Sequence, residues 1–182
     1  RQPLRGRMIL FTIGTNEQPF DRLIRAAAAL EGDEPLLVQH GASREPHGRG
    51  EWVDFLSFDE LASRARDARV VVCHAGVGSI MLARRCGHRP VVVPRRHHLG
   101  EAVDDHQLHL ARRLAQSGIV TLVEDIEDLP AAIAAADVAT IGESSPLRGA
   151  SALTADLRGV LDGLGAARRP ARDPEIELRS AA

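Results

Sequence analysis

The feature that most constrains the fold of this chain is an alternation of short apolar runs with longer segments of helical periodicity. The apolar runs lie at 8–13, 36–38, 53–56, 70–73, 91–93 and 119–123, and the helical patterns at 20–30, 59–68, 79–86, 103–116 and 129–136. Short runs rich in Val, Ile and Leu and bounded by glycine or polar residues are typical of buried strands. The alternation therefore predicts an α/β fold, a Rossmann-like parallel sheet with helices on both faces.

The length of 182 residues suits one such domain and is too short for two full ones. We expect the α/β domain to span 8–142, because the composition changes to a linker with Gly, Ser and Pro after 142. Residues 1–7 read as an N-terminal extension, 143–165 as a linker followed by one more amphipathic helix, and 166–182 as a flexible polar tail.

The basic residues exclude several kinds of chemistry. All 23 are arginine, since the sequence holds no lysine, so neither the lysine-dependent phosphate loop nor Schiff-base catalysis is available. The net charge is −2, and with no tyrosine and one tryptophan the chain cannot build aromatic platforms for single-stranded nucleic acid. We therefore expect no nucleic-acid partner.

The cysteines and the hydropathy pattern bear on the compartment. Cys73 and Cys86 form no C-x-x-C pair, which argues against a zinc ribbon or a disulfide framework. No apolar run approaches the ~18–20 residues of a membrane span, and the first residues lack the apolar stretch of a secretory signal. We therefore expect a cytoplasmic protein whose contact with a membrane is at most peripheral.

Candidate binding residues follow two of the expected strands, where a doubly wound sheet binds its ligands. The first loop, Gly14-Thr15-Asn16, offers a flexible glycine, a hydroxyl and an amide, although it could also be an ordinary turn. The second, His74-Ala-Gly-Val-Gly-Ser79, precedes a helix that we expect Ser79 to cap. Its glycines would let the backbone approach a phosphate. The alternative is a tight turn around a satisfied histidine, and Met81 rules out the dinucleotide fingerprint G-x-G-x-x-G.

A third polar segment runs from Pro94 to Gln107 after another expected strand. Arg95 and Arg96 stand just past the strand end, where a phosphate could be bound. Gln107 shares a helix face with apolar positions 103, 110, 111 and 114, so we expect it to point inward and to need a hydrogen-bond partner. The hydroxyl groups of a ligand would serve as that partner.

Two other kinds of site are less well supported by this segment. A metal could be held by some of His97, His98, Glu101, Asp105, His106 and His109, but their spacing is not that of a structural zinc site and also suits a solvated helix face. We expect no metal. A Ser-His-Asp hydrolase is disfavoured because no G-x-S-x-G motif is present.

Taken together, the order and spacing of these segments resemble the C-terminal, donor-binding domain of glycosyltransferase family 28. The resemblance is carried by 8–15 with 20–23, by 74–79, by Pro94-Arg95 and by Gly100-Glu-Ala-Val-Asp-Asp-His-Gln107, and it covers about residues 8–140. It is strongest to short stand-alone members, namely the exopolysaccharide and capsule subunits and the catalytic subunit of the dolichol-linked N-acetylglucosaminyltransferase.

The resemblance implies one half of a GT-B enzyme, a metal-independent and cofactor-free hexosyltransferase that moves a sugar from UDP to a lipid-linked acceptor with inversion. It places the diphosphate against Gly14, Thr15, Gly76, Gly78 and Ser79 and the donor sugar against His106 and Gln107. We expect Asn16, Arg95 and Asp105 to complete the nucleotide-sugar site. Arg95 would offset the charge of the departing UDP, and His74 and Glu101 are the candidate general bases. Leu82 stands where many relatives carry a glutamate that binds the ribose, so ribose recognition must differ here.

In full-length members of the GT-B fold a second domain binds the acceptor and closes the cleft. With room for one domain, we expect a separate, membrane-anchored acceptor-binding subunit to recruit this chain to the inner face of the membrane and to complete its active site. Two alternatives remain open: a non-catalytic subunit that stimulates another transferase, and an NADP-dependent reductase that would use Arg95 and Arg96 for the 2′-phosphate.

Overall fold

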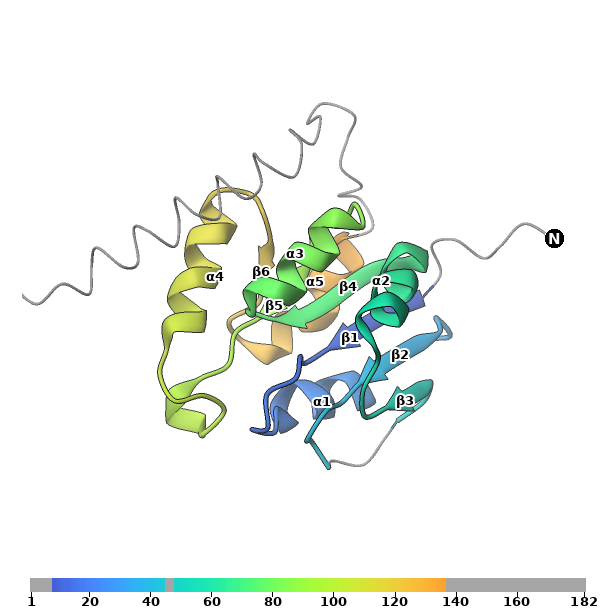
Figure 1. Cartoon of the computed structure of the whole chain (residues 1–182), viewed down its shortest axis with the longest axis horizontal. Helices are drawn as coiled ribbons and strands as arrows, with labels where there is room; N and C mark the ends of the chain where they lie inside the picture. The colour runs from blue at the N-terminus through green and yellow to red at the C-terminus, as the bar shows by residue number, and fades with distance from the viewer. Residues whose placement is uncertain (1–7, 45–47, 137–182) are drawn as a thin grey trace, which may run out of the picture. The chain divides into compact units, whose positions relative to one another are not determined.

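The computed structural model describes residues 8–44 and 48–136, which form a parallel sheet with helices on both faces (Figure 1). The strands are β1 (Met8–Thr12), β2 (Leu36–Gln39), β3 (Glu51–Val53), β4 (Ala68–His74), β5 (Val91–Val93) and β6 (Thr121–Leu122). The helices are α1 (Asp21–Ala28), α2 (Phe58–Asp67), α3 (Val77–Arg85), α4 (His106–Gln116) and α5 (Leu129–Ala136), with 3-10 turns η1 (His97–Leu99) and η2 (Ile126–Asp128). The predicted fold class is confirmed. The expected segments at 1–7, 143–165 and 166–182 lie outside the described residues.

The strand order, β3-β2-β1-β4-β5-β6, places a switch point in the middle of the sheet. From β1 the chain first builds outward to β3, then returns through β4 on the other side of β1 and builds outward to β6. At the switch point Phe11 pairs with Val38 on one side and with Val72 on the other. Ligands of such sheets bind beyond the carboxyl ends of the two strands that flank the switch point, here β1 and β4.

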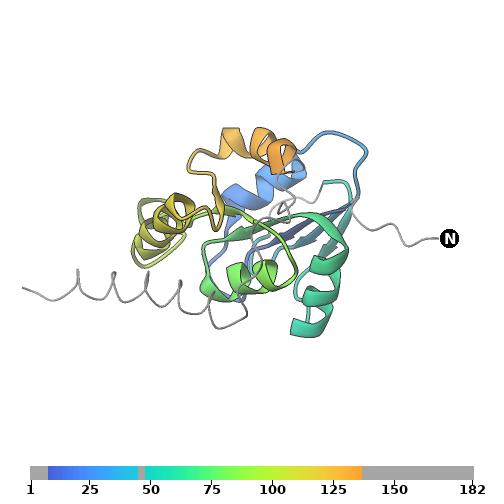
Figure 2. The same ribbon diagram turned by 90° about the horizontal axis from the view of Figure 1, so that it is seen from above.

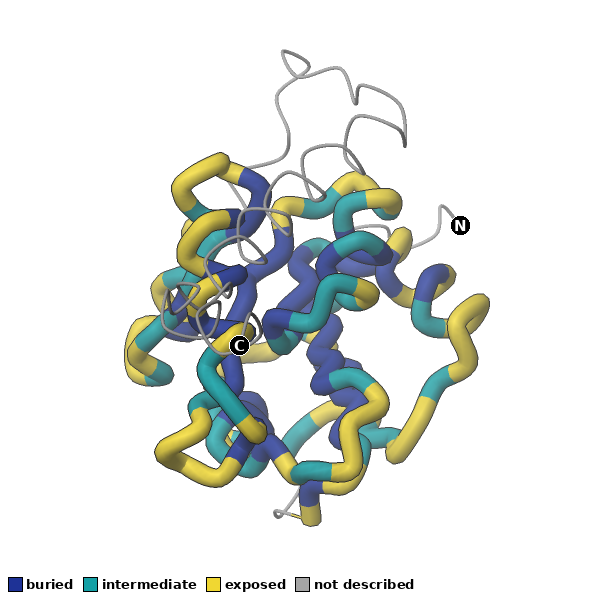
Figure 3. Tube along the Cα trace, turned by 60° about the vertical axis from the view of Figure 1, so that its left-hand side comes forward, coloured by how far each residue is buried: buried dark blue, intermediate teal, exposed yellow. Residues whose placement is uncertain are grey.

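Successive residues of each strand face opposite sides of the sheet, and each side has its own apolar core. Ile9 and Phe11 of β1 pack with α1 and α5, whereas Leu10 packs with α2 and α3. Seen from above, α1 and α5 lie on one side of the strands and α2 and α3 on the other (Figure 2). Strands β1, β2, β4 and β5 form the buried centre of the described part of the chain, and the edge strands β3 and β6 are partly exposed (Figure 3). None of the helices described is long and apolar enough to span a bilayer.

The ends of several elements differ from the sequence prediction. Helix α3 begins at Val77 with Gly76 as its N-cap, so Ser79 lies in the first turn and makes no capping hydrogen bond. Strand β3 ends at Val53, two residues before Phe55, which was expected inside a strand. Residues 54–57 instead lead into α2, whose start is fixed by a capping box between Ser57 and the third helical residue, a glutamate.

Helix α4 begins at His106 and not at Val103, and Val103 is 77% exposed instead of lying on the apolar face of the helix. The preceding acids hold a loop in place of a helical turn: Asp104 accepts from the amide of His106 at 3.0 Å, and Asp105 accepts from the amide of His97 at 2.9 Å. Short acidic side chains often bind backbone amides in this way and delay the start of a helix.

Candidate functional site

A cleft of about 530 Å³ opens at the carboxyl ends of β1 and β4, where the switch point predicts a ligand site. It is lined by Thr12, Gly14, Thr15, Asn16, Gln39, Phe55, Leu56, Phe58, Leu61, His74, Gly78, Ser79 and Leu82. The two loops singled out in the sequence, after β1 and after β4, therefore meet in one cleft. That these residues bind a ligand stays a prediction.

One wall of the cleft is apolar and was missed in the sequence. Leu56, Phe58 and Leu61, from the β3–α2 loop and α2, line it together with Phe55 and Leu82, and the two phenylalanines are 61% and 66% exposed. Large apolar side chains that are exposed next to one another are typical of a binding surface. The available signal was the pair of phenylalanines around the capping serine, in a chain that has only four.

The imidazole of His74 lies between the two glycine loops. A Cβ atom at Gly76 would lie 2.1 Å from its Nε2 atom, and a Cβ atom at Gly14 would lie 2.5 Å from its Cε1 atom. Gly14 also has a φ of +76°, which L side chains rarely adopt. These two glycines therefore make room for the histidine, whereas a Cβ atom at Gly78 would meet nothing within 4 Å.

The charge state of His74 follows from its surroundings. Burial and, to a smaller extent, the nearby charge of Arg95 lower the pKa of its imidazole to about 4, although a hydrogen bond with the backbone of Thr12 acts to raise it. At neutral pH the ring is thus neutral, and among the described residues its buried Nδ1 atom has no hydrogen-bond partner. A neutral imidazole with so low a pKa is a weak general base, but it can hydrogen-bond a ligand in the cleft.

The first turn of α3 supplies the electropositive part of the cleft. Its backbone N–H groups have no partner within the helix and carry the positive end of the helix dipole. Gly78 and Ser79 of this turn line the cleft, and the N-cap, Gly76, contributes no side chain. Among the lining residues there is neither an arginine nor a carboxylate. An anion bound here would be held by N–H groups, hydroxyls and the helix dipole.

Arg95 lies inside the fold and not at the cleft. Its side chain is fully buried and donates through Nη2 to the carbonyl of Ile13 at 3.2 Å. Its Nη1 donates to the carbonyls of Gln18 (2.9 Å), Pro19 (3.1 Å) and Glu101 (3.1 Å). Nη1 and Nη2 are therefore occupied by the protein's own carbonyls, and the buried Nε has no partner among the described residues, contrary to the expectation that the guanidinium faces a phosphate.

Glu101 is also a structural residue. It is 6% exposed, and its carboxylate accepts from Nε and Nη2 of Arg22 at 3.0 and 2.9 Å and from the amide of Arg96 at 2.9 Å. Both oxygens are engaged and neither reaches the cleft, so the structure does not support Glu101 as the general base. The side chain of Arg96 donates to the carbonyl of Glu124 at 2.8 Å. With both arginines occupied, the reductase alternative loses its 2′-phosphate site.

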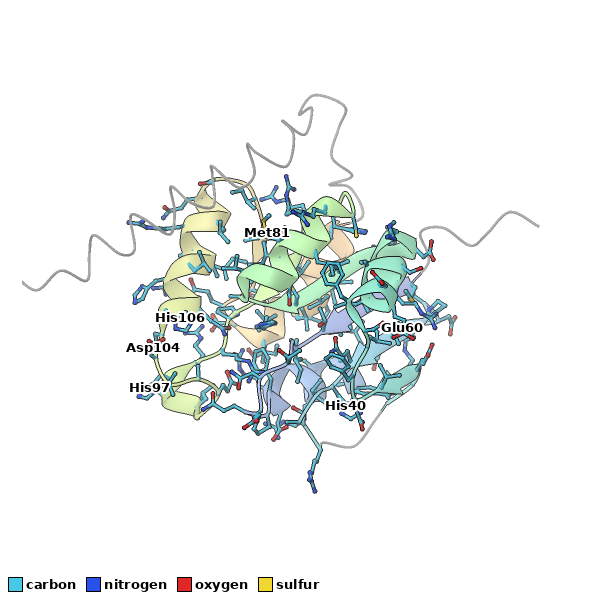
Figure 4. All side chains as sticks on the ribbon, in the orientation of Figure 1. His40, Glu60, Met81, His97, Asp104 and His106 are labelled. Carbon is cyan, nitrogen blue, oxygen red and sulfur yellow. The ribbon has the colours of Figure 1, made fainter. Side chains whose placement is uncertain are left out.

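The remaining predicted residues lie at the start of α4, outside the lining of the cleft. His106 is exposed and bound to Asp104, with His97 nearby on the same loop (Figure 4). Gln107 points inward as predicted and is 8% exposed, but its Oε1 accepts from the amide of Arg95 at 3.4 Å. Across residues 8–44 and 48–136, no three His, Cys, Asp or Glu side chains come close enough together to hold a metal ion.

A second hollow of about 590 Å³ lies at the opposite edge of the sheet, between α1 and α5. Its charged lining includes Glu34 and Arg69, which pair with each other at 2.6 Å. It contains none of the residues predicted from the sequence and none of the glycine loops. The smaller cleft at the switch point is therefore the candidate site.

Comparison with known families and proteins shows which family the chain belongs to. Residues 8–139 match the model of the glycosyltransferase family 28 C-terminal domain. The UDP-N-acetylglucosamine transferase subunit ALG13 of Yarrowia lipolytica is 30% identical over 122 residues, which cover 59% of this chain and 60% of that protein. The UDP-N-acetylglucosamine–N-acetylmuramyl-(pentapeptide) pyrophosphoryl-undecaprenol N-acetylglucosamine transferase of Aromatoleum aromaticum is 35% identical over 92 residues, which cover 50% of this chain and 24% of that protein.

Solved structures share the fold. The calicheamicin glycosyltransferase CalG4 matches with a TM-score of 0.54 at 19% identity, and the glycotransferase of kitacinnamycin with a TM-score of 0.51 at 22% identity. Each match covers 91% of this chain and 41% of the other, so this chain corresponds to less than half of these GT-B enzymes. By its sequence match and its fold, the chain belongs to glycosyltransferase family 28, and the part that matches is the C-terminal domain of that family.

Proposed function

We propose that this chain binds a UDP-sugar and is the donor-binding, catalytic part of an inverting glycosyltransferase. The observation that carries the proposal is the division of the switch-point cleft into an apolar wall and an electropositive end. A nucleoside diphosphate has the same division, with a flat base at one end and a doubly charged group at the other. The printed names of the relatives, two kinds of UDP-N-acetylglucosamine transferase, support UDP as the nucleotide.

The diphosphate would lie at the start of α3, against the N–H groups of Gly78 and Ser79, with Thr15 and Asn16 opposite. The base would lie against Phe55 and its apolar neighbours. Leu82 in that wall leaves no carboxylate for the ribose hydroxyls, so the ribose would depend on polar groups of the loop after β1.

We propose a direct displacement in which the acceptor hydroxyl attacks the anomeric carbon from the face opposite UDP. The first turn of α3 would stabilise the charge that develops on UDP, without a metal ion. His74, which lines the cleft, would hydrogen-bond a phosphate oxygen as a neutral imidazole. Because no carboxylate lines the cleft in the described part of the chain, the general base would come from the acceptor-binding part of the enzyme.

The acceptor-binding part would be a separate, membrane-anchored subunit that also recruits this chain to the membrane. Support comes from the name of the Yarrowia relative, which is a subunit, and the name of the Aromatoleum relative indicates a lipid-linked acceptor. The binding site for the sugar donor would lie in this chain.

Coexpression of the two proteins tests this division of labour. Gly78→Trp should abolish sugar transfer into lipid in membranes that contain both proteins, because the new ring would block the phosphate end of the cleft. If Gly78→Trp leaves transfer intact, the chain is a stimulatory subunit and the donor site lies elsewhere. Gln107→Ala should lower transfer if the sugar reaches the start of α4.

The position of the site can be mapped by titrating isotopically labelled protein with UDP. We expect amide resonances of Gly14, Leu56 and Gly78 to shift with one saturable isotherm, while those of Ala29 and Ile133, in the hollow at the opposite edge, stay in place. Shifts confined to the opposite edge would contradict the proposed site.

A further inference from the structure

Arg95 joins both ends of the loop that forms one side of the cleft. The carbonyl of Ile13 precedes Gly14-Thr15-Asn16, and the carbonyls of Gln18 and Pro19 follow it. One guanidinium therefore binds the entry and the exit of this loop through different nitrogens. A lysine ammonium could not bridge the two ends in the same way, because all its donors come from one atom.

Neighbouring groups hold the guanidinium in place. Its carbon lies 4.7 Å from the ring centroid of Phe20, and the amide of Phe20 donates to the hydroxyl of Ser43 at 2.7 Å. The amide of Arg95 itself is bound by Gln107 at the start of α4. Arg95 thus connects the loop after β1, the loop after β5 and α4, three of the parts that the family resemblance places around the donor.

The burial of this cation needs a reason beyond packing. A buried guanidinium is costly to desolvate, and apolar side chains of similar volume often stabilise a fold as well or better. Here Nη1 and Nη2 donate to carbonyls at both ends of the loop that carries residues of the cleft, while the buried Nε has no partner among the described residues.

We propose that Arg95 is a positioning residue that fixes the loop of residues 13–20 and so sets Gly14, Thr15 and Asn16 at the phosphate end of the cleft. This inference rests on the proposed function, because it takes the cleft as the donor site. Arg95 acts through the loop and does not touch the nucleotide.

The test compares the full chain with Arg95→Met and Arg95→Lys by two independent readouts. The first is amide hydrogen exchange at Ile13 and Phe20, referred to the global free energy of unfolding of each protein. The second is the Kd for UDP by calorimetry. In Arg95→Met we expect exchange at these amides to rise about tenfold and UDP binding to weaken about tenfold or more, and Arg95→Lys should recover part of each effect.

Arg69→Met is the matched control. Arg69 is a partly buried arginine, bound to Glu34 and to the carbonyl of Ile133 at the opposite edge of the sheet. Its removal should lower the stability of the protein without changing relative exchange at Ile13 and Phe20 or the Kd for UDP. This separates positioning of the loop from a general loss of stability.

The outcomes are distinct. Native exchange and native UDP affinity in a folded Arg95→Met protein overturn the inference, and so does a loosened loop with unchanged affinity. If Arg95→Met does not fold, Arg95→Lys decides by the same two readouts. If the wild-type protein does not bind UDP, the proposed function fails, while the exchange data still show whether Arg95 holds the loop.

Discussion

His74 occupies space that Gly14 and Gly76 leave free, and this arrangement decides which substitutions the cleft tolerates. His74 and the two glycines could be singled out from the sequence, because they follow the ends of expected strands. The structural role of the glycines, which is to leave room for the imidazole, could not be predicted from the sequence. It depends on how two loops that are distant in the sequence pack against each other. The low pKa of His74 was equally inaccessible, since it comes from burial and from Arg95.

Gly76→Ala should destabilise the protein by about 1–3 kcal/mol, because the new methyl group would overlap the ring of His74. Gly78→Ala is the control within the same helix: its Cβ atom meets nothing, and alanine favours a helix over glycine by up to ~1 kcal/mol. Urea unfolding of both variants measures the difference. Equal stabilities would show that the ring does not lie where we describe it.

The pKa of His74 also predicts how stability depends on pH. The folded protein takes up the proton only near pH 4, whereas the unfolded chain takes it up near 6.5. The contribution of His74 is therefore fully present above pH 6.5 and is lost as the pH falls towards 4, with a total of about 3 kcal/mol. Unfolding free energies of wild type and His74→Gln across this range test it.

The difference between wild type and His74→Gln removes the contributions of the other titrating groups to the pH dependence of stability. His88, whose pKa burial also lowers, and Glu60, whose pKa its bonds to Ser57 lower, are present in both proteins. Parallel curves for wild type and His74→Gln between pH 6.5 and 4 would contradict the buried, neutral state of His74.

The centres of the helices and strands were predictable, and their ends were not. Apolar periodicity located the five α-helices described and the strands other than β3, which shares only Val53 with the strand expected at 53–56, because burial on two faces of a sheet imposes it. Ends depend on single hydrogen bonds: Asp104 and Asp105 delay α4, and Gly76 allows α3 to begin before Ser79. Because β3 ends at Val53, Phe55 and Leu56 line the cleft and do not belong to a strand. The strand expected at 53–56 therefore left the apolar wall of the cleft unpredicted.

The capping box of α2 gives a prediction for one element. The hydroxyl of Ser57 accepts from the amide of Glu60 at 3.3 Å, and the carboxylate of Glu60 accepts from the amide of Ser57 at 2.9 Å. Ser57→Ala should cost about 1 kcal/mol of unfolding free energy. Ser63→Ala, at an exposed interior position of the same helix, should be neutral or slightly stabilising. Thermal or urea unfolding that ranks the two variants in the opposite order would contradict the cap.

For the molecule as a whole, topology explains which sequence expectations succeeded. Two loops distant in the chain meet at the cleft because β1 and β4 are neighbours at the switch point, a consequence of the predicted sheet type. Arg95 and Glu101 also follow a strand end, but they turn into the protein and bind its own backbone and side chains. Sequence position alone does not distinguish an arginine that faces a ligand from one that holds a loop.

The central claim is that the switch-point cleft binds the nucleotide of a UDP-sugar, and calorimetric titration of the full chain with UDP tests it most directly. We predict saturable binding of one UDP per chain that persists with EDTA present and is abolished by Gly78→Trp, whose indole would block the phosphate end of the cleft. Circular dichroism should show that the variant is folded. The absence of saturable binding by UDP and by every UDP-sugar, or full affinity in Gly78→Trp, would contradict the claim.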